Sequence, residues 1–216
     1  MCIRDSAYAV HLGLAWIDPI RARDSLRFKL SERKAALGGG GLTLVQDTGT
    51  GGSWPVSTDR VVWALGARAT LRALPESERA AFAEEARLAL RAAAEADREA
   101  AWDSADGLYR GEQSFLDWRE QSYPAWVAAD VVHIGMSKAL STNVLHLEAL
   151  RLLAQLSEEA GQTDDAARYA AWADALRDNI HAAFWLESAG SWSTMLTTSL
   201  DPVSYTHLTL PTNREV

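Results

Sequence analysis

The sequence predicts an all-α fold built from three helical hairpins. Apolar residues recur at three- and four-residue steps in three paired regions, 7–36, 57–101 and 142–185, and this spacing is typical of amphipathic helices. Within each pair the connection is short, which makes the two helices antiparallel neighbours. The connections between pairs are long, and no fixed sequence period of the kind found in helical solenoids is visible. This alternation suits a toroid of hairpins whose long loops gather at one end.

The first pair begins with the apolar run 7–17, which is expected to form a buried helix. Asp18 then offers an N-cap with Pro19 at the first helical position, so a second helix is expected from here to about residue 36. The glycine run 38–41 ends this helix, and Leu42–Val45 is expected to be a short extended segment.

The second pair is expected to begin with a helix over residues 56–73, capped by Ser57 or Thr58. Pro75 opens the next helix, which is expected to run to about Ala101. Four residues at helical spacing should face the core, namely Phe82, Ala86, Leu90 and Ala94.

The third pair is the clearest hairpin of the chain. A broad leucine face is expected to end at Gly161, a glycine in the position that often terminates a helix. Thr163 should cap the partner helix, whose inward residues are expected to be Tyr169, Trp172, Leu176, Ile180 and Phe184.

The composition argues against several classes of function. The formal charge of −8 and the pI near 5.1 lack the basic character expected of a nucleic-acid binder. No apolar run approaches the roughly 20 residues that span a bilayer. We expect no cofactor and no metal, since the histidines, among them His11, His133, His146 and His181, lack ligand spacing. The oligomeric state and the cellular compartment stay open.

Both ends of the chain differ from its body. Residues 1–5 and 203–216 resemble translated sequencing-adapter sequence, and the second stretch is rich in threonine without a helical period. We therefore set both ends aside and expect residues 6–202 to be a fragment of a longer catalytic domain from a bacterial, metagenomic source.

The stretch Asp106–Trp126 carries the densest chemistry. It combines Glu112, Asp117 and Glu120 with two arginines and five aromatic residues. A connection this long between helices is usually functional or disordered, and its aromatic content argues against disorder. Aromatic rings stack on the apolar faces of sugar rings, so we expect part of a carbohydrate site here.

Four blocks of the sequence resemble the six-hairpin glycosidase superfamily, the (α/α)6 toroids of trehalase-, glucoamylase- and debranching-enzyme-like proteins. The blocks are Ala7–Asp18, Gln46–Ala67, Asp106–Pro124 and Ser141–Leu153. The resemblance implies a carbohydrate substrate and glycoside hydrolysis, of an α-glucoside type with inversion. Three hairpins would be half of such a toroid. The superfamily also makes a periplasmic or secreted location possible, without excluding the cytoplasm.

Glycosidases generally need two carboxylates that flank the scissile bond. Asp117 and Glu120 would lie on one face of a helical turn, so they would approach the sugar from the same side. We therefore expect one catalytic group here, the general acid, with Asp117 first, Glu120 second and Glu112 third. The resemblance implies that the base comes from later hairpins. A purely structural alternative is that Asp117, Arg119 and Glu120 form a buried ion network.

Sugar-binding residues are expected beside the acid. Asp59 and Arg60 match a pair that binds sugar hydroxyls in glucoamylase-like relatives, although a capping aspartate and a surface arginine would give the same sequence. The remaining candidates are Trp54, Trp118, Arg119, Tyr123 and Trp126.

Two other classes of function stay open. A sugar epimerase or polysaccharide lyase could use the same toroid, and in an epimerase His11 or His133 would matter. A non-enzymatic α-solenoid that binds other proteins is the third reading. The clustered carboxylates and aromatic residues of 106–126 favour an enzyme over the solenoid.

Overall fold

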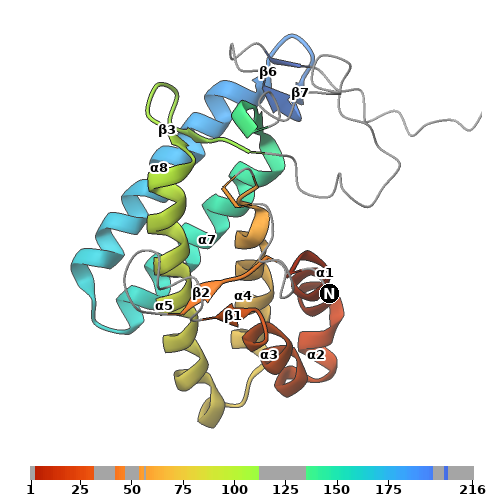
Figure 1. Ribbon diagram of the computed structural model, residues 1–216, viewed down its shortest axis with the longest axis vertical. Helices are drawn as coiled ribbons and strands as arrows, with labels where there is room; N and C mark the ends of the chain where they lie inside the picture. Colours follow the sequence, from red (N-terminus) through yellow and green to blue (C-terminus); the bar gives the residue numbers. More distant parts are fainter. Residues whose placement is uncertain are drawn as a thin grey trace, which may run out of the picture.

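The computed structural model describes residues 3–31, 42–46, 54–55, 57–111, 135–196 and 202–203, with the backbone alone at 31, 59, 202 and 203. Three helix pairs lie side by side, accompanied by two-residue strands (Figure 1). This arrangement confirms the predicted all-α class and the three hairpins.

The first hairpin joins one bent helix to a shorter one. The helix α1 (Ile3–Ala9) continues through a π-helical turn, η1 (Val10–Leu14), into α2 (Ala15–Ile17). The second helix, α3 (Pro19–Arg27), follows directly. The predicted cap is confirmed, because Oδ1 of Asp18 accepts the backbone N–H of Arg21 at 3.0 Å.

The prediction that this second helix reaches residue 36 was wrong. The strand β1 (Leu30–Ser31) pairs antiparallel with β2 (Thr43–Leu44), and Leu30 stands opposite Leu44. Leu44 is fully buried. Strand pairing that buries this leucine takes over the backbone hydrogen bonds that a longer helix would have used. The predicted extended segment at 42–45 is confirmed.

The first helix is less buried than its apolar sequence predicts. Leu12, Trp16 and Ile17 are exposed by 77 %, 64 % and 83 %, because they lie on the side turned away from the other helices. Ile3, which falls in the stretch set aside as an artefact, is fully buried in α1. Residues 3–5 thus belong to the folded helix, while the domain limits 6–202 stay a prediction.

The second hairpin forms the centre of the molecule. The 3-10 turn η3 (Asp59–Val62) leads into α4 (Trp63–Ala73), and α5 (Glu76–Ala100) returns beside it. The four residues predicted to face the core from α5 are all buried. Gly66 allows α4 to lie close to the first hairpin, since a Cβ there would stand 3.2 Å from the carbonyl oxygen of Ala7.

The third hairpin agrees closely with the sequence. The helices α7 (Leu140–Glu159) and α8 (Thr163–Phe184) are joined by a tight turn in which Gly161 adopts a φ of +72°. That left-handed conformation suits glycine. The predicted cap was wrong, since α8 has no side-chain cap and Thr163 is its first helical residue.

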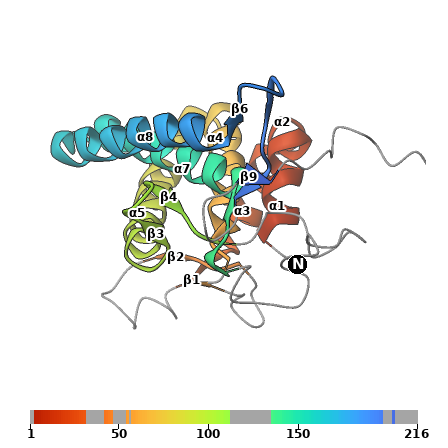
Figure 2. The same cartoon turned by 90° about the horizontal axis from the view of Figure 1, so that it is seen from above.

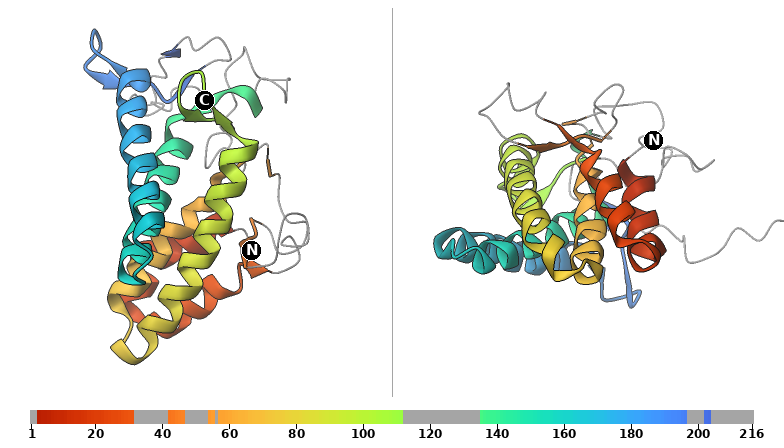
Figure 3. Two further views of the ribbon diagram at one scale, coloured as in Figure 1. Left: turned by 90° about the vertical axis from the view of Figure 1, so that its left-hand side faces the viewer. Right: turned by 90° about the horizontal axis from the view of Figure 1, so that it is seen from below.

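Short strands gather where α5 and α8 end and α7 begins. They are β3 (Trp102–Asp103) with β4 (Leu108–Tyr109), β6 (Trp185–Leu186) with β7 (Ser191–Trp192), and the set β5 (Lys138–Ala139), β8 (Met195–Leu196) and β9 (Pro202–Val203). Figure 2 shows this end from above, and the left panel of Figure 3 shows it from the side. Among the described helices, none has the length and apolarity needed to cross a membrane.

Candidate functional site

The long segment predicted to carry the chemistry lies outside the described residues. This holds for Glu112, Asp117, Trp118, Arg119, Glu120, Tyr123 and Trp126. Their roles therefore stay predictions. The structure does describe both places where the segment joins the helices, and it describes Trp54 and Arg60.

Backbone hydrogen bonds hold the two ends of this segment together. The N–H of Gly111 donates to the carbonyl oxygen of Ser137 at 2.9 Å, and Gly111 has a φ of +131°. Next to it, the N–H of Arg110 donates to the carbonyl oxygen of Ala101. Gly111 and Ser137, which flank residues 112–134 in the sequence, are thus in contact between the end of α5 and the beginning of α7.

A buried lysine fixes this point electrostatically. Lys138 is 3 % exposed, and its Nζ lies 2.8 Å from Oδ2 of Asp103 and 2.6 Å from Oδ2 of Asp106. Arg110 adds a second cation, 2.9 Å from the same oxygen of Asp103. The hydrogen bond from Lys138 is the main cause that holds the pKa of Asp103 well below its usual range. The β3–β4 hairpin is therefore tied to β5.

Trp54 and Arg60, both predicted to bind sugar, meet on one buried carboxylate. Oδ1 of Asp97 accepts Nη2 of Arg60 at 2.6 Å and the indole N–H of Trp54 at 2.7 Å. The guanidinium also lies 5.2 Å from the centre of the Trp54 ring. Asp97, near the C-terminal end of α5, therefore positions both residues.

The burial of Arg60 and Asp97 is nearly complete. Arg60 is 4 % exposed and Asp97 is 0 % exposed, so Arg60 is not the surface residue of the structural alternative. Burial raises the pKa of the Asp97 carboxyl, while the charge of Arg60 and the indole N–H oppose that change. Oδ2 of Asp97 and Nε of Arg60 have no hydrogen-bond partner among the described residues. Such unpaired buried polar atoms are uncommon in folded proteins.

His146 connects this group to the base of the long segment. Its Nε2 lies 2.8 Å from the hydroxyl of Thr58, and its ring stacks on Tyr109 at a centroid distance of 3.8 Å. Burial, and secondarily the charge of Arg60, lowers the pKa of His146 to about 3. The imidazole is therefore neutral near pH 7. His146 is therefore a packing residue, and its contact with Thr58 explains why Thr58 does not cap the helix.

Asn143 completes the connection on the other side of Tyr109. Its side chain accepts the N–H of Tyr109 at 2.8 Å and donates to the carbonyl oxygens of Tyr109 and Ala139. One side chain thus ties β4 to the beginning of α7. The two halves of the predicted site, residues 54–60 and the attachment of 112–134, are joined in one network, in which hydrogen bonds of Thr58 and Asn143 flank the stacked rings of His146 and Tyr109.

Sequence reasoning missed Asp97, Lys138 and Asn143. Asp97 could have been found, because it continues the inward stripe of α5 three residues after Ala94 and four before Ala101. Asp59 begins η3 beside Arg60, and its proposed contact with sugar stays a prediction. Among the described residues, no group of three or more potential ligands could hold a metal ion.

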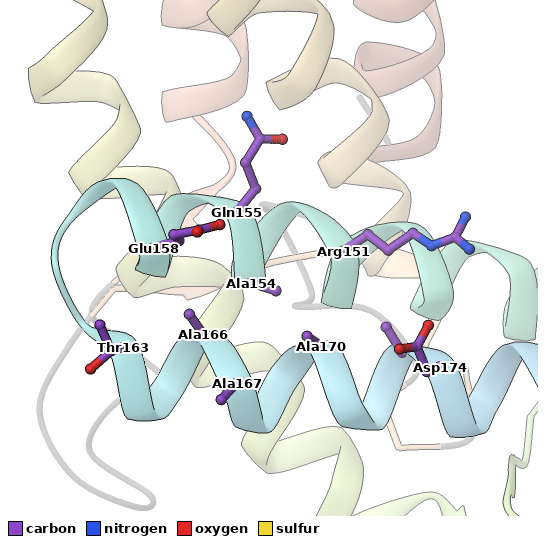
Figure 4. Close-up of a pocket in the computed structure, with 10 residues that line it drawn as sticks. Arg151, Ala154, Gln155, Glu158, Thr163, Ala166, Ala167, Ala170 and Asp174 are labelled. Atoms are coloured by element: carbon purple, nitrogen blue, oxygen red, sulfur yellow. The ribbon is translucent and has the colours of Figure 1, made fainter.

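An open groove lies elsewhere, between the half of α7 and the half of α8 that adjoin their turn (Figure 4). It is lined largely by small side chains, including Ala166, Ala167 and Ala170. The polar network described above is at the opposite end of these helices. The groove therefore does not contribute to the candidate site.

The model of the bacterial alpha-L-rhamnosidase six-hairpin glycosidase domain matches residues 96–211, more than half of the 216 residues. The chain belongs to this family. No curated protein and no solved structure matches it. The resemblance to six-hairpin glycosidases is confirmed, and the helical solenoid loses its support.

The matched part of this six-hairpin glycosidase domain contains much of the network. Asp97, the segment 112–134, Lys138 and His146 all fall within it, whereas Trp54 and Arg60 precede it. The match also extends beyond residue 202, the predicted end of the domain, and β9 (Pro202–Val203) spans that predicted end. The origin of the last residues stays a prediction.

Proposed function

We propose that this domain hydrolyses glycosidic bonds and that the segment 112–134 supplies the general acid. One observation carries the proposal: in a glycosidase-family chain, the residues that flank this carboxylate-rich segment are held beside the Trp54–Arg60–Asp97 group. Asp117 is the first candidate for the acid, Glu120 the second and Glu112 the third.

The group around Asp97 supports a sugar-binding wall. Trp54 is only partly buried, so its ring can offer a flat apolar surface to a sugar while Asp97 holds the indole N–H. Arg60 contributes a fixed cation behind this ring. Asp59, Trp118, Arg119, Tyr123 and Trp126 would extend this wall.

The proposed reaction is hydrolysis with inversion. The acid gives its proton to the glycosidic oxygen as the bond to the anomeric carbon breaks. A carboxylate base on the other side takes a proton from the attacking water, and the two carboxyls stand roughly 6.5–9.5 Å apart. We propose that the base lies outside these 216 residues, in later hairpins. The 216-residue chain is then expected to bind sugar without hydrolysing it.

The substrate is proposed from the family description. Because that description names α-L-rhamnosidases, α-L-rhamnosides are the first substrates to test, and α-glucosides, suggested by the sequence resemblance, are the second. The protein encoded by the complete gene should be incubated with aryl glycosides and disaccharides of both sugars. We expect release of free sugar in the opposite anomeric form, which proton NMR can monitor.

The same incubations separate the alternatives. A lyase would release an unsaturated sugar that absorbs ultraviolet light, and an epimerase would convert a free sugar without cleaving any bond. Either product, with no hydrolysis, would contradict the proposal. Hydrolysis by the 216-residue chain itself would contradict the placement of the base.

A further inference from the structure

Three aromatic rings form a cluster at the end of α8 that the proposed site does not use. Trp185 and Trp192 are direct partners across the β6–β7 hairpin, with ring centres 5.3 Å apart. His181, one turn earlier on α8, lies 6.3 Å from Trp185 and 5.5 Å from Trp192. Trp185 is only half-buried.

The cluster leaves one large aromatic surface exposed. Trp192 is 42 % exposed, although its ring is held by edge-on contacts with both neighbours. The indole N–H of Trp185 donates to Oε2 of Glu187 at 2.6 Å, which fixes the second ring. An ordered, exposed indole beside an imidazole and a carboxylate combines a stacking surface with hydrogen-bonding groups.

The size of this surface favours a sugar over a protein. Within residues 185–196, all of which the structure describes, Trp192 is the only exposed large hydrophobic residue. Its neighbours Glu187, Ser188 and Ser191 are polar. A stable protein interface needs on the order of 800 Å² from each partner with an apolar centre. A single indole edged by polar groups matches one pyranose ring instead.

The position of the cluster links it to the candidate site. The chain passes from Trp192 through Ser193 into β8, where Met195 pairs with Ala139. Ala139 belongs to β5, which follows the attachment of the segment 112–134. The N–H of Leu140 donates to the carbonyl oxygen of Thr194, closing the same corner. The aromatic cluster therefore stands at the same end of the helices as the candidate site (Figure 1).

We propose that Trp192, supported by Trp185 and His181, is a sugar-binding subsite that holds a more distant residue of an oligosaccharide chain. The proposal rests on the proposed function, because it assumes a carbohydrate substrate at the neighbouring site. It adds that the substrate extends along the end of the domain toward the β6–β7 hairpin. Glu187 and His181 would form hydrogen bonds with the hydroxyl groups of the stacked sugar.

The test is a titration of the 216-residue chain, labelled with 15N at the tryptophan indoles, with methyl α-L-rhamnopyranoside. The Trp54 and Trp192 signals are assigned with Trp54→Phe and Trp192→Phe variants. Saturable shifts at Trp192 and Trp185 are expected. Trp16 is the matched control, since it is 64 % exposed on α2 and should not respond.

The two reporters separate the two proposals. A shift at Trp54 without one at Trp192 would overturn the subsite while supporting sugar binding at the candidate site. A shift at Trp192 without one at Trp54 would support the subsite and contradict the placement of the main site. Equal, non-saturable shifts at Trp192 and Trp16, or no shift at Trp192, would overturn the subsite. If the position of the Trp192 signal changes with protein concentration in the absence of sugar, this surface mediates self-association, and the subsite is overturned.

A second measurement uses a longer ligand. In native gels that contain a rhamnose-bearing polysaccharide, the unmodified chain should be retarded, and Trp192→Ala should weaken binding by about tenfold. Trp16→Ala should migrate like the unmodified chain. Equal retardation of the unmodified chain and Trp192→Ala would overturn the proposal.

Discussion

Nη2 of Arg60 lies 2.6 Å from Oδ1 of Asp97, and both side chains are almost completely buried. This contact joins the beginning of the second hairpin to the end of its returning helix. The same carboxylate oxygen holds Trp54. The proposed sugar-binding wall thus depends on Asp97, which belongs to none of the motifs recognised in the sequence.

Replacing Asp97 should be costly. Asp97→Ala leaves the Arg60 charge and the Trp54 indole N–H buried without their acceptor, and loss of one partner of a buried pair costs about 3–5 kcal/mol. Asp97→Asn keeps the oxygen but loses the charge, so an intermediate loss is expected. Denaturant unfolding measures both. Asp174→Ala, at a pair where Asp174 is 64 % exposed, should cost less than about 1 kcal/mol. A similar small loss for Asp97→Ala would contradict the role of the pair.

His146 should make the fold sensitive to acid. Its pKa is lowered to about 3 in the folded chain and is near 6.5 when unfolded. The unfolded state therefore binds a proton first as the pH falls, so stability present above about pH 6.5 is lost toward pH 3, with a slope of up to about 1.4 kcal/mol per pH unit. His146→Gln should reduce that slope. Identical slopes for both proteins would show that His146 is not the titrating group.

Lys138 should stabilise the attachment of the long segment in a pH-dependent way. The pKa of Asp103 is lowered chiefly by Lys138, so the stabilisation is present above the usual aspartate pKa of about 4 and is lost as the pH falls below it. Lys138→Met should therefore be much less stable than the unmodified chain at pH 7 but closer to it at pH 3.

The matched control for Lys138→Met is Arg21→Met, because Arg21 is 84 % exposed in its ion pair. It should change stability little at either pH. Amide hydrogen exchange adds a local readout: the N–H of Gly111, bonded to Ser137, should exchange faster in Lys138→Met. An unchanged exchange rate would show that Lys138 does not stabilise the attachment of the segment.

Gly66 should resist substitution, whereas Gly13 should accept it. A Cβ at Gly66 would stand 3.1 Å from Leu26 Cδ2 and 3.2 Å from the carbonyl oxygen of Ala7. Gly66→Ala is therefore expected to cost about 1–3 kcal/mol through overpacking. A Cβ at Gly13 meets nothing within 4 Å, and Gly13→Ala should stabilise by up to about 1 kcal/mol through helix propensity. The reverse order in thermal unfolding would show that the first two hairpins do not pack as described.

The helices were predictable because apolar spacing records which face is buried. The stripe of Phe82, Ala86, Leu90 and Ala94, and the glycine turn at Gly161, follow from local sequence alone. The end of α3 was not predictable, because Leu30 leaves the helix to pair with Leu44, which is distant in sequence. The predicted cap at Thr58 failed for a similar reason, because its hydroxyl bonds a histidine from another hairpin.

The site was predictable in its residue types more than in its connections. Trp54 and Arg60 were selected from their motif, and the structure places them together. Asp97 and Lys138 appear in sequence as ordinary charges on a helix and a loop. Their roles depend on partners 37 to 43 and 35 residues away, which local patterns do not reveal.

The central claim is that Asp117 acts as a general acid, and leaving-group dependence tests it most directly. In the protein from the complete gene, kcat/KM should be measured for Asp117→Asn on an alkyl α-L-rhamnoside and on its dinitrophenyl counterpart. The alkyl substrate needs a proton on its leaving oxygen, so a loss of at least about 100-fold is expected. The dinitrophenolate leaves without a proton, so its loss should be much smaller. Undiminished turnover of the alkyl substrate, or equal losses on both, would contradict the assignment.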